Sequence, residues 1–175
     1  MRFSGLVFFS LVLLVPGVSQ ALDVDVYGGL GTGHVVQKNS PPNDDSSDTG
    51  EKVYLGSRFL GPIGLEIAYY DLGQYENHTS EAYVYGASAV FYHDIRGMSL
   101  FAKAGIIEWN KSDIATGAKT SGEDVSYGFG INLAVDKHVL FRTEIEYFRK
   151  VGKNETTGDP GTEMSMLSFG VNFRF

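Results

Sequence analysis

Hydrophobic and polar residues alternate strictly over the last positions of the chain. One set of alternate positions holds Leu167, Phe169, Val171, Phe173 and Phe175, and the other holds Ser168, Gly170, Asn172 and Arg174. Successive side chains of a β-strand point to opposite sides, so this segment predicts a strand with one bulky apolar face and one small or polar face. A strand of this kind can separate lipid from a polar interior.

The same alternation recurs upstream, and no long amphipathic helix interrupts it. Eight strands are predicted from Leu22 onward. They cover roughly residues 22–37, 51–60, 63–72, 81–94, 98–109, 123–135, 138–150 and 163–175.

Long and short connections alternate between the predicted strands. The long ones, rich in Asn, Asp, Ser, Thr, Gly and Pro, are Lys38–Gly50, Gly73–Ser80, Asn110–Gly122 and Val151–Thr162. The short ones are Gly61-Pro62, Ile95–Gly97 and Asp136-Lys137. Outer-membrane barrels have an even strand count, short periplasmic turns and longer extracellular loops. The predicted fold is therefore all-β, an eight-stranded antiparallel up-and-down transmembrane β-barrel with its long loops outside the cell.

The two faces of the predicted strands differ in composition. One face is apolar and aromatic, whereas the other carries most of the glycines and the charged residues. A soluble lipocalin-like barrel would put the apolar face inside and the charges outside. We favour the opposite orientation because an eight-stranded interior is narrow and suits small residues with a few long charged ones. Aromatic girdles at the membrane boundaries are predicted from Tyr69, Tyr70, Tyr83, Tyr85, Trp109, Tyr127 and Tyr147.

The inward face carries a nearly balanced set of charges. We predict a lumen charge network of Arg58, Glu66, Lys103, Arg142, Glu144, Glu146 and Arg174. Buried charges persist when they are paired and hydrogen-bonded, so the near balance favours salt bridges that plug the lumen. The alternative is a narrow porin-like channel for ions or small solutes, which opens when a pair exchanges partners.

The N-terminal residues have the layout of a secretory signal peptide. Arg2 precedes an apolar run from Leu6 to Val15, and the small residues Ser19 and Ala21 precede the expected cleavage point. Residues 1–21 are therefore predicted to be removed, which leaves one barrel domain over 22–175. Its net charge would be 13 − 21 = −8, because Arg2 is the only charged residue removed. An acidic exported protein is a poor candidate for binding nucleic acid, and the absence of cysteine excludes disulfides.

Three segments resemble the OmpA-like transmembrane β-barrel family of small porin-like and Opa-like proteins. They are the opening Val26–Gly29, the stretch Gly64–Gly73 and the ending Phe169–Phe175. The ending is similar to the assembly signal of outer-membrane barrels, carried here by Phe169, Val171, Phe173 and Phe175.

The resemblance implies residence in the bacterial outer membrane. We expect a monomer in contact with outer-membrane lipid and lipopolysaccharide. The resemblance also implies recognition by the barrel-assembly machinery. Larger family members continue into a periplasmic peptidoglycan-binding domain, which is not expected here because the chain stops at Phe175. The family has no single biochemical activity, so we expect a structural role and surface interaction through the long loops.

Signals for catalysis or metal binding are weak. His78-Thr79-Ser80 has the His-x-Ser spacing of lipid A deacylases, but so short a match arises easily by chance. We therefore expect no enzyme activity, with a lipid A-modifying hydrolase as the alternative. Asp44, Asp45 and Asp48 could share Ca²⁺, but a solvated acidic loop is the preferred interpretation. No cofactor is expected.

Overall fold

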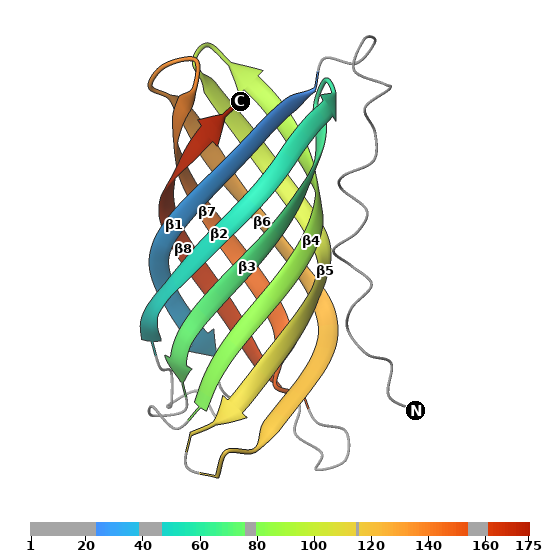
Figure 1. Ribbon diagram of the computed structural model, residues 1–175, viewed down its shortest axis with the longest axis vertical. Coiled ribbons are helices and arrows are strands. Elements are labelled where there is room, and N and C mark those ends of the chain that lie inside the picture. The colour runs from blue at the N-terminus through green and yellow to red at the C-terminus, as the bar shows by residue number, and fades with distance from the viewer. Residues whose placement is uncertain (1–23, 39–46, 76–79, 115, 154–160) are drawn as a thin grey trace.

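A computed structural model describes residues 24–38, 47–75, 80–114, 116–153 and 161–175. Its strands form one closed antiparallel barrel in which each strand pairs with its neighbours in sequence and β1 pairs with β8 (Figure 1). They are β1 (Asp25–Lys38), β2 (Ser47–Leu60), β3 (Ile63–Tyr75), β4 (Ser80–Ile95), β5 (Met98–Asp113), β6 (Lys119–Ala134), β7 (Val139–Val151) and β8 (Thr162–Arg174). The predicted fold class and strand order are confirmed. The predicted signal peptide and the loop residues Asp44, Asp45, His78 and Thr79 lie outside the described residues.

Several strands reach farther toward the long connections than predicted. β2 begins at Ser47, β5 continues to Asp113 and β6 begins at Lys119. The prediction ended these strands where the apolar alternation stops, but cross-strand pairing continues through polar residues beyond that point. In the part of the chain that the structure describes, no helix is long and apolar enough to cross a membrane.

The short turns lie at one end of the barrel. Arg96 and Gly97 have φ angles of 31° and 81°, and positive values at both central residues are typical of a type I′ hairpin turn. The third turn spans residues 135–138, which is longer than predicted. There the Asp136 carboxylate accepts hydrogen bonds from the backbone N–H groups of His138 at 2.6 Å and Val139 at 2.9 Å. These bonds hold the pKa of Asp136 below its ordinary value.

The outer surface of the barrel carries a broad apolar band. Leu30, Val53 and Ile106 are 59%, 60% and 66% exposed, and the phenylalanines of four strands lie on the same surface. A continuous exposed apolar surface of this kind is what a barrel presents to lipid. The orientation predicted from the sequence, with the apolar face outward, is therefore the one observed.

The lumen is filled by side chains in successive layers. Toward the long loops lies an apolar layer, which includes Val35, Leu72, Trp109, Phe148 and Met166. Toward the short turns lies a mainly aromatic layer of Tyr27, Tyr54, Val90, Tyr92 and Phe101.

The prediction that Tyr70 and Trp109 belong to the outer girdles is wrong. Their side chains are only 3% and 2% exposed and belong to the apolar layer of the lumen. The alternation of strand side chains explains this, because Tyr70 shares a face with Glu66, and Trp109 shares one with Lys103. A Cβ added at Gly122 would lie 2.4 Å from the Trp109 ring, so this glycine makes the space that the indole occupies.

Candidate functional site

Six charged side chains meet in the middle of the lumen, and we call them the central charge cluster. They come from four strands: Lys52 from β2, Glu66 from β3, Lys103 from β5, and Arg142, Glu144 and Glu146 from β7. All six are buried. Three cations thus face three carboxylates in a space closed to water, where pairing must offset the cost of removing each charge from solvent.

Lys103 joins all three carboxylates of the central charge cluster. Its Nζ lies 2.9 Å from Glu66 Oε1, 2.7 Å from Glu144 Oε1 and 2.6 Å from Glu146 Oε1. The ammonium group of Lys103 also donates a hydrogen bond to the Tyr70 hydroxyl at 3.2 Å. This lysine therefore ties β3 to β7 across the lumen.

Arg142 and Lys52 complete the pairing from either side. Arg142 Nη1 lies 2.7 Å from Glu66 Oε2, and its Nε lies 2.9 Å from Glu144 Oε2. Lys52 Nζ lies 2.8 Å from Glu146 Oε2 and also contacts Glu144. Every carboxylate therefore contacts at least two cations, and the cluster has no net charge.

Aromatic residues enclose the central charge cluster and add hydrogen bonds to it. Tyr70 donates its hydroxyl proton to Glu146 Oε1 at 2.6 Å, and Tyr27 donates to Glu66 Oε2 at 2.9 Å. The Arg142 guanidinium lies 4.1 Å from the centre of the Phe101 ring, within the range of a cation–π interaction. The cluster is thus held by hydrogen bonds and ring contacts as well as by charge.

Arg58 and Arg174 lie apart from the cluster, at the short-turn mouth of the barrel. Arg58 donates two hydrogen bonds to the Asp94 carboxylate, from Nη2 at 2.8 Å and from Nη1 at 3.2 Å. Arg174 Nε lies 3.7 Å from Asp25 Oδ2. Both pairs are partly exposed to solvent. We call them the mouth pairs.

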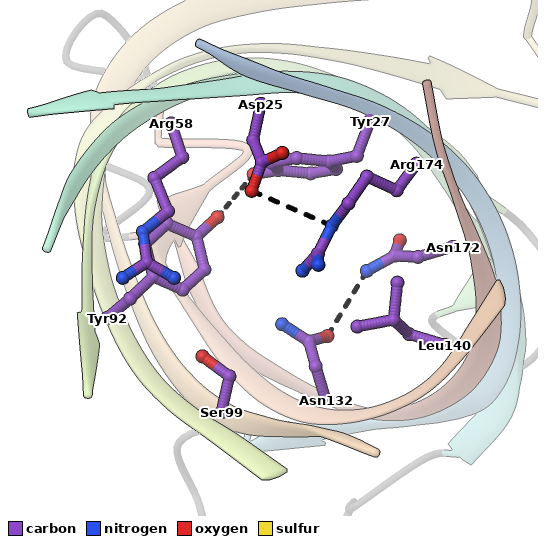
Figure 2. A pocket seen from close by; sticks show the side chains of 9 residues that line it. All are labelled: Asp25, Tyr27, Arg58, Tyr92, Ser99, Asn132, Leu140, Asn172 and Arg174. Carbon is purple, nitrogen blue, oxygen red and sulfur yellow. Dashed lines mark hydrogen bonds and ion pairs between the residues drawn. The ribbon is translucent and has the colours of Figure 1, made fainter. Parts of the chain in front are cut away.

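The mouth pairs line a cavity of about 390 Å³ that opens at the short-turn end. Farther in, the space narrows to about 20 Å³, lined by the residues that Figure 2 labels. Its walls are tied together where Tyr27 and Tyr92 share a hydrogen bond of 2.6 Å and Asn172 donates to Asn132 at 3.2 Å. The remaining space is about that of a single water molecule. The cavity is therefore a vestibule that is open at the short-turn end and closes before it reaches the central charge cluster.

The structure brings five of the seven predicted network residues together and separates the other two. Glu66, Lys103, Arg142, Glu144 and Glu146 belong to the central charge cluster, while Arg58 and Arg174 form the mouth pairs. Sequence reasoning missed Lys52. The signal was present, because Lys52 occupies the same alternate positions of β2 as Gly56 and Arg58.

The candidate catalytic and metal-binding residues are only partly described. Ser80 begins β4 and is fully buried. Asp48 accepts hydrogen bonds from the backbone N–H groups of Gln74 and Thr49, both at 2.7 Å. The three glutamates of the central charge cluster already surround the Lys103 ammonium group. Among the residues that the structure describes, no group of three or more His, Cys, Asp or Glu side chains could hold a metal ion.

Comparison with known proteins identifies relatives of the whole barrel. The OmpA-like transmembrane domain matches residues 20–175. Neisserial surface protein A (NspA) is similar in structure, with a TM-score of 0.71, 19% identity, and coverage of 86% of this chain and 97% of that one. No curated protein sequence matches this chain.

Two further solved structures share the fold. Ail of Yersinia pestis, solved in complex with the heparin analogue sucrose octasulfate, has a TM-score of 0.60 and 15% identity and covers 87% of this chain and 99% of its own. The N-terminal β-barrel domain of Pseudomonas aeruginosa OprF has a TM-score of 0.59 and 14% identity and covers 86% of this chain and 97% of its own.

Proposed function

The chain belongs to the OmpA-like transmembrane domain family, and we propose that this outer-membrane barrel is a closed structural protein that presents its loop end for surface interaction. The observation that carries the proposal is the central charge cluster. Three cations and three carboxylates from four strands pair with one another inside the lumen, so its charges are balanced and occupy the space that a solute would need.

The packing on both sides of the cluster supports a closed lumen. Toward the loops the apolar layer includes Trp109, Phe148 and Met166, each almost completely buried. A buried apolar layer is a barrier to ions, because a charge entering it would lose its hydration. Toward the turns the vestibule narrows to about 20 Å³. A solute would have to displace packed side chains at both levels.

The test is solute permeation through the purified full-length mature protein in liposomes. We expect swelling rates in small sugars to equal those of protein-free liposomes. Swelling as fast as that of a general porin control would contradict the closed barrel and favour the narrow channel. Boiling-dependent gel mobility provides the control that the protein is folded in the membrane.

The loop end is the surface from which we propose that the protein contacts partners. Ail was solved with an anionic heparin analogue. The outer face of this barrel near the loops instead carries more acidic residues, among them Glu51, Asp71, Glu108 and Glu123, than basic ones such as Lys119 and Arg149. Charge complementarity therefore favours a cationic partner for this chain.

We propose that the protein has no enzyme activity of its own. Ser80 is fully buried, so its hydroxyl is not placed to attack a lipid. Replacement of Ser80 by Ala should leave the lipid A profile unchanged by mass spectrometry. If cells with the Ser80→Ala variant showed a changed lipid A acylation pattern, and the wild-type protein restored the original pattern, that result would favour the lipid A hydrolase.

The remaining expectations concern biogenesis. We propose that residues 1–21 are cleaved on export and that Phe169, Val171, Phe173 and Phe175 form the signal read by the assembly machinery. Phe169 and Phe173 are 59% and 48% exposed on the outer surface, so they are accessible to another protein or to lipid. Deleting Phe175 should lower the folded yield in cells more than it lowers refolding in detergent.

A further inference from the structure

The β5–β6 hairpin extends beyond the seam that joins β6 to β7. On one side β6 pairs with β5 along its whole length, as far as Lys119. On the other side its pairing with β7 stops at Ser126, which lies opposite Phe148. Among the residues that the structure describes, no strand pairs with this side of residues 119–125, and we call that stretch the open edge. Figure 1 shows the hairpin, yellow to light orange, reaching past the other strands at the loop end.

Alternate residues of β6 direct their backbone groups to its two sides. The Ala134 N–H donates to Gly97 O at the β5 side, whereas the Val135 N–H donates to Val139 O at the β7 side. Neither ladder of β6 contains a register shift. The backbone N–H and C=O groups of the odd-numbered residues of β6 therefore point to the β7 side along the whole strand.

The open edge consequently presents the N–H and C=O groups of Lys119, Ser121 and Glu123. Val125 differs, because its N–H donates to the Asp124 carboxylate at 2.7 Å. A row of unpaired strand groups is a template on which another extended chain can add.

The seam between β2 and β3 shows how this barrel closes a comparable gap. Regular pairing between these strands stops at Glu51 and Asp71. Beyond that point both strands continue, and the Asp48 carboxylate accepts the Gln74 N–H at 2.7 Å, so a side chain takes the place of the regular backbone pairing. No corresponding side-chain contact covers Ser121 or Glu123 among the described residues.

The side chains around the open edge indicate the chemistry of a partner. Glu108 and Glu123 lie directly opposite each other on β5 and β6, and both are exposed. Like charges in directly opposed positions destabilise a sheet. A cationic side chain beside Glu123 would offset that repulsion. Two exposed cations flank this pair of glutamates: Lys119 near the tip of the hairpin, and Arg149 on β7, directly after the last residue that pairs with β6.

We propose that the open edge binds an extended, basic segment of a partner protein, which adds to the β5–β6 hairpin as a further strand. Lys119, Ser121 and Glu123 supply the backbone hydrogen bonds, and Glu108 and Glu123 select lysine or arginine. This inference rests on the proposed surface role and gives it a place on the barrel and a class of partner.

The test uses the full-length mature protein refolded in bicelles and a short fluorescent peptide that alternates lysine and valine. We expect saturable binding that weakens with added salt. Ser121→Pro should weaken binding roughly tenfold or more, because proline removes the outward N–H and blocks the approach of a strand. The matched control Ser121→Ala keeps the backbone groups and should bind like the wild type. Glu123→Gln should weaken binding and reduce its salt dependence.

A second peptide of the same sequence, N-methylated on every residue so that neither of its edges can donate hydrogen bonds, separates strand addition from attraction of charge alone. It should fail to bind the wild type, and this arm decides the matter if Ser121→Pro does not fold. Equal binding by both peptides, equal binding to Ser121→Pro and Ser121→Ala, or no binding at all would overturn the inference. Self-association of the wild type that Ser121→Pro abolishes would overturn it in favour of a second copy of this chain. The liposome permeation test is independent of these binding measurements: liposomes made permeable by the protein would contradict the closed barrel but would leave the binding results unchanged.

Discussion

The lumen contains two sets of ion pairs that differ mainly in their contact with water. In the central charge cluster the side chains of Lys103 and Glu144 are 3% and 0% exposed. In the mouth pairs the side chains of Arg58 and Asp94 are 21% and 55% exposed, although their geometry is equally good. The comparison indicates that the contribution of a salt bridge to stability depends on how far it is exposed to water. Water screens the mouth pairs, whereas the central charges have only one another.

Breaking the central charge cluster should produce the largest effect. Arg142→Ala leaves Glu66 and Glu144 without one of their cations in a buried site, which should cost about 3–5 kcal/mol of unfolding free energy. Urea unfolding in lipid vesicles, followed by the fluorescence of the single tryptophan, Trp109, measures the loss. Arg149→Ala is the matched control on the same strand, because Arg149 is exposed. Equal losses in the two variants would contradict the assigned importance of burial.

Removing one hydrogen bond to the cluster should have an intermediate effect. Tyr70→Phe deletes the hydroxyl that donates to Glu146 and keeps the ring, so we expect a loss of about 1–3 kcal/mol. Its neighbour Tyr69 faces outward and packs against Tyr83 and Tyr85, so Tyr69→Phe is the matched control. The same unfolding measurement should show little change for Tyr69→Phe. A larger loss of unfolding free energy in Tyr69→Phe than in Tyr70→Phe would contradict the importance assigned to the lumen hydrogen bond.

Removing a mouth pair should cost much less. Arg58→Ala breaks a solvent-exposed pair with Asp94, which should lower the unfolding free energy by about 0–1 kcal/mol. The loss should shrink further when salt is added, whereas that of Arg142→Ala should not. A loss as large as that of Arg142→Ala would show that the mouth pairs behave as buried ones.

The smallest expected effect is a pH dependence at the same end of the barrel. The pKa of Asp136 is lowered by hydrogen bonds from two backbone N–H groups in a solvent-exposed turn. Its contribution is present above the ordinary carboxyl pKa of about 4 and is lost as the pH falls through the lower folded value. Asp136→Asn should therefore lose a little stability at neutral pH and become indistinguishable from the wild type in strong acid. A difference that grows on acidification would reverse this assignment.

The alternation of side chains, together with that of long and short connections, was enough to predict the barrel. Its orientation was predicted from the small residues on one face, which suit a narrow interior. The alternation of side chains, applied without exception, would also have placed Lys52, Tyr70 and Trp109 in the lumen. Those three were missed because Lys52 precedes the predicted apolar run, while the two aromatic residues were assigned by residue type. Glycine explains how a large aromatic side chain fits into a narrow lumen, because Gly122 leaves room for the indole of Trp109.

Depth along the barrel could not be read from the sequence. Arg58 and Arg142 both occupy inward positions, yet one lies in the vestibule and the other in the central charge cluster. Separating them requires the register between strands, which depends on long-range pairing. The open edge depends on the same information, since it exists only because the β6 pairing with β7 stops at Ser126 while its pairing with β5 continues.

Single-channel recording in planar bilayers tests the closed lumen most directly. The folded wild-type protein should give no conductance steps over a wide voltage range, and Arg58→Ala should be equally silent because it alters only the vestibule. Arg142→Ala should be the variant most prone to brief openings. Regular, long-lived steps from the wild-type protein would contradict a lumen closed by the central charge cluster.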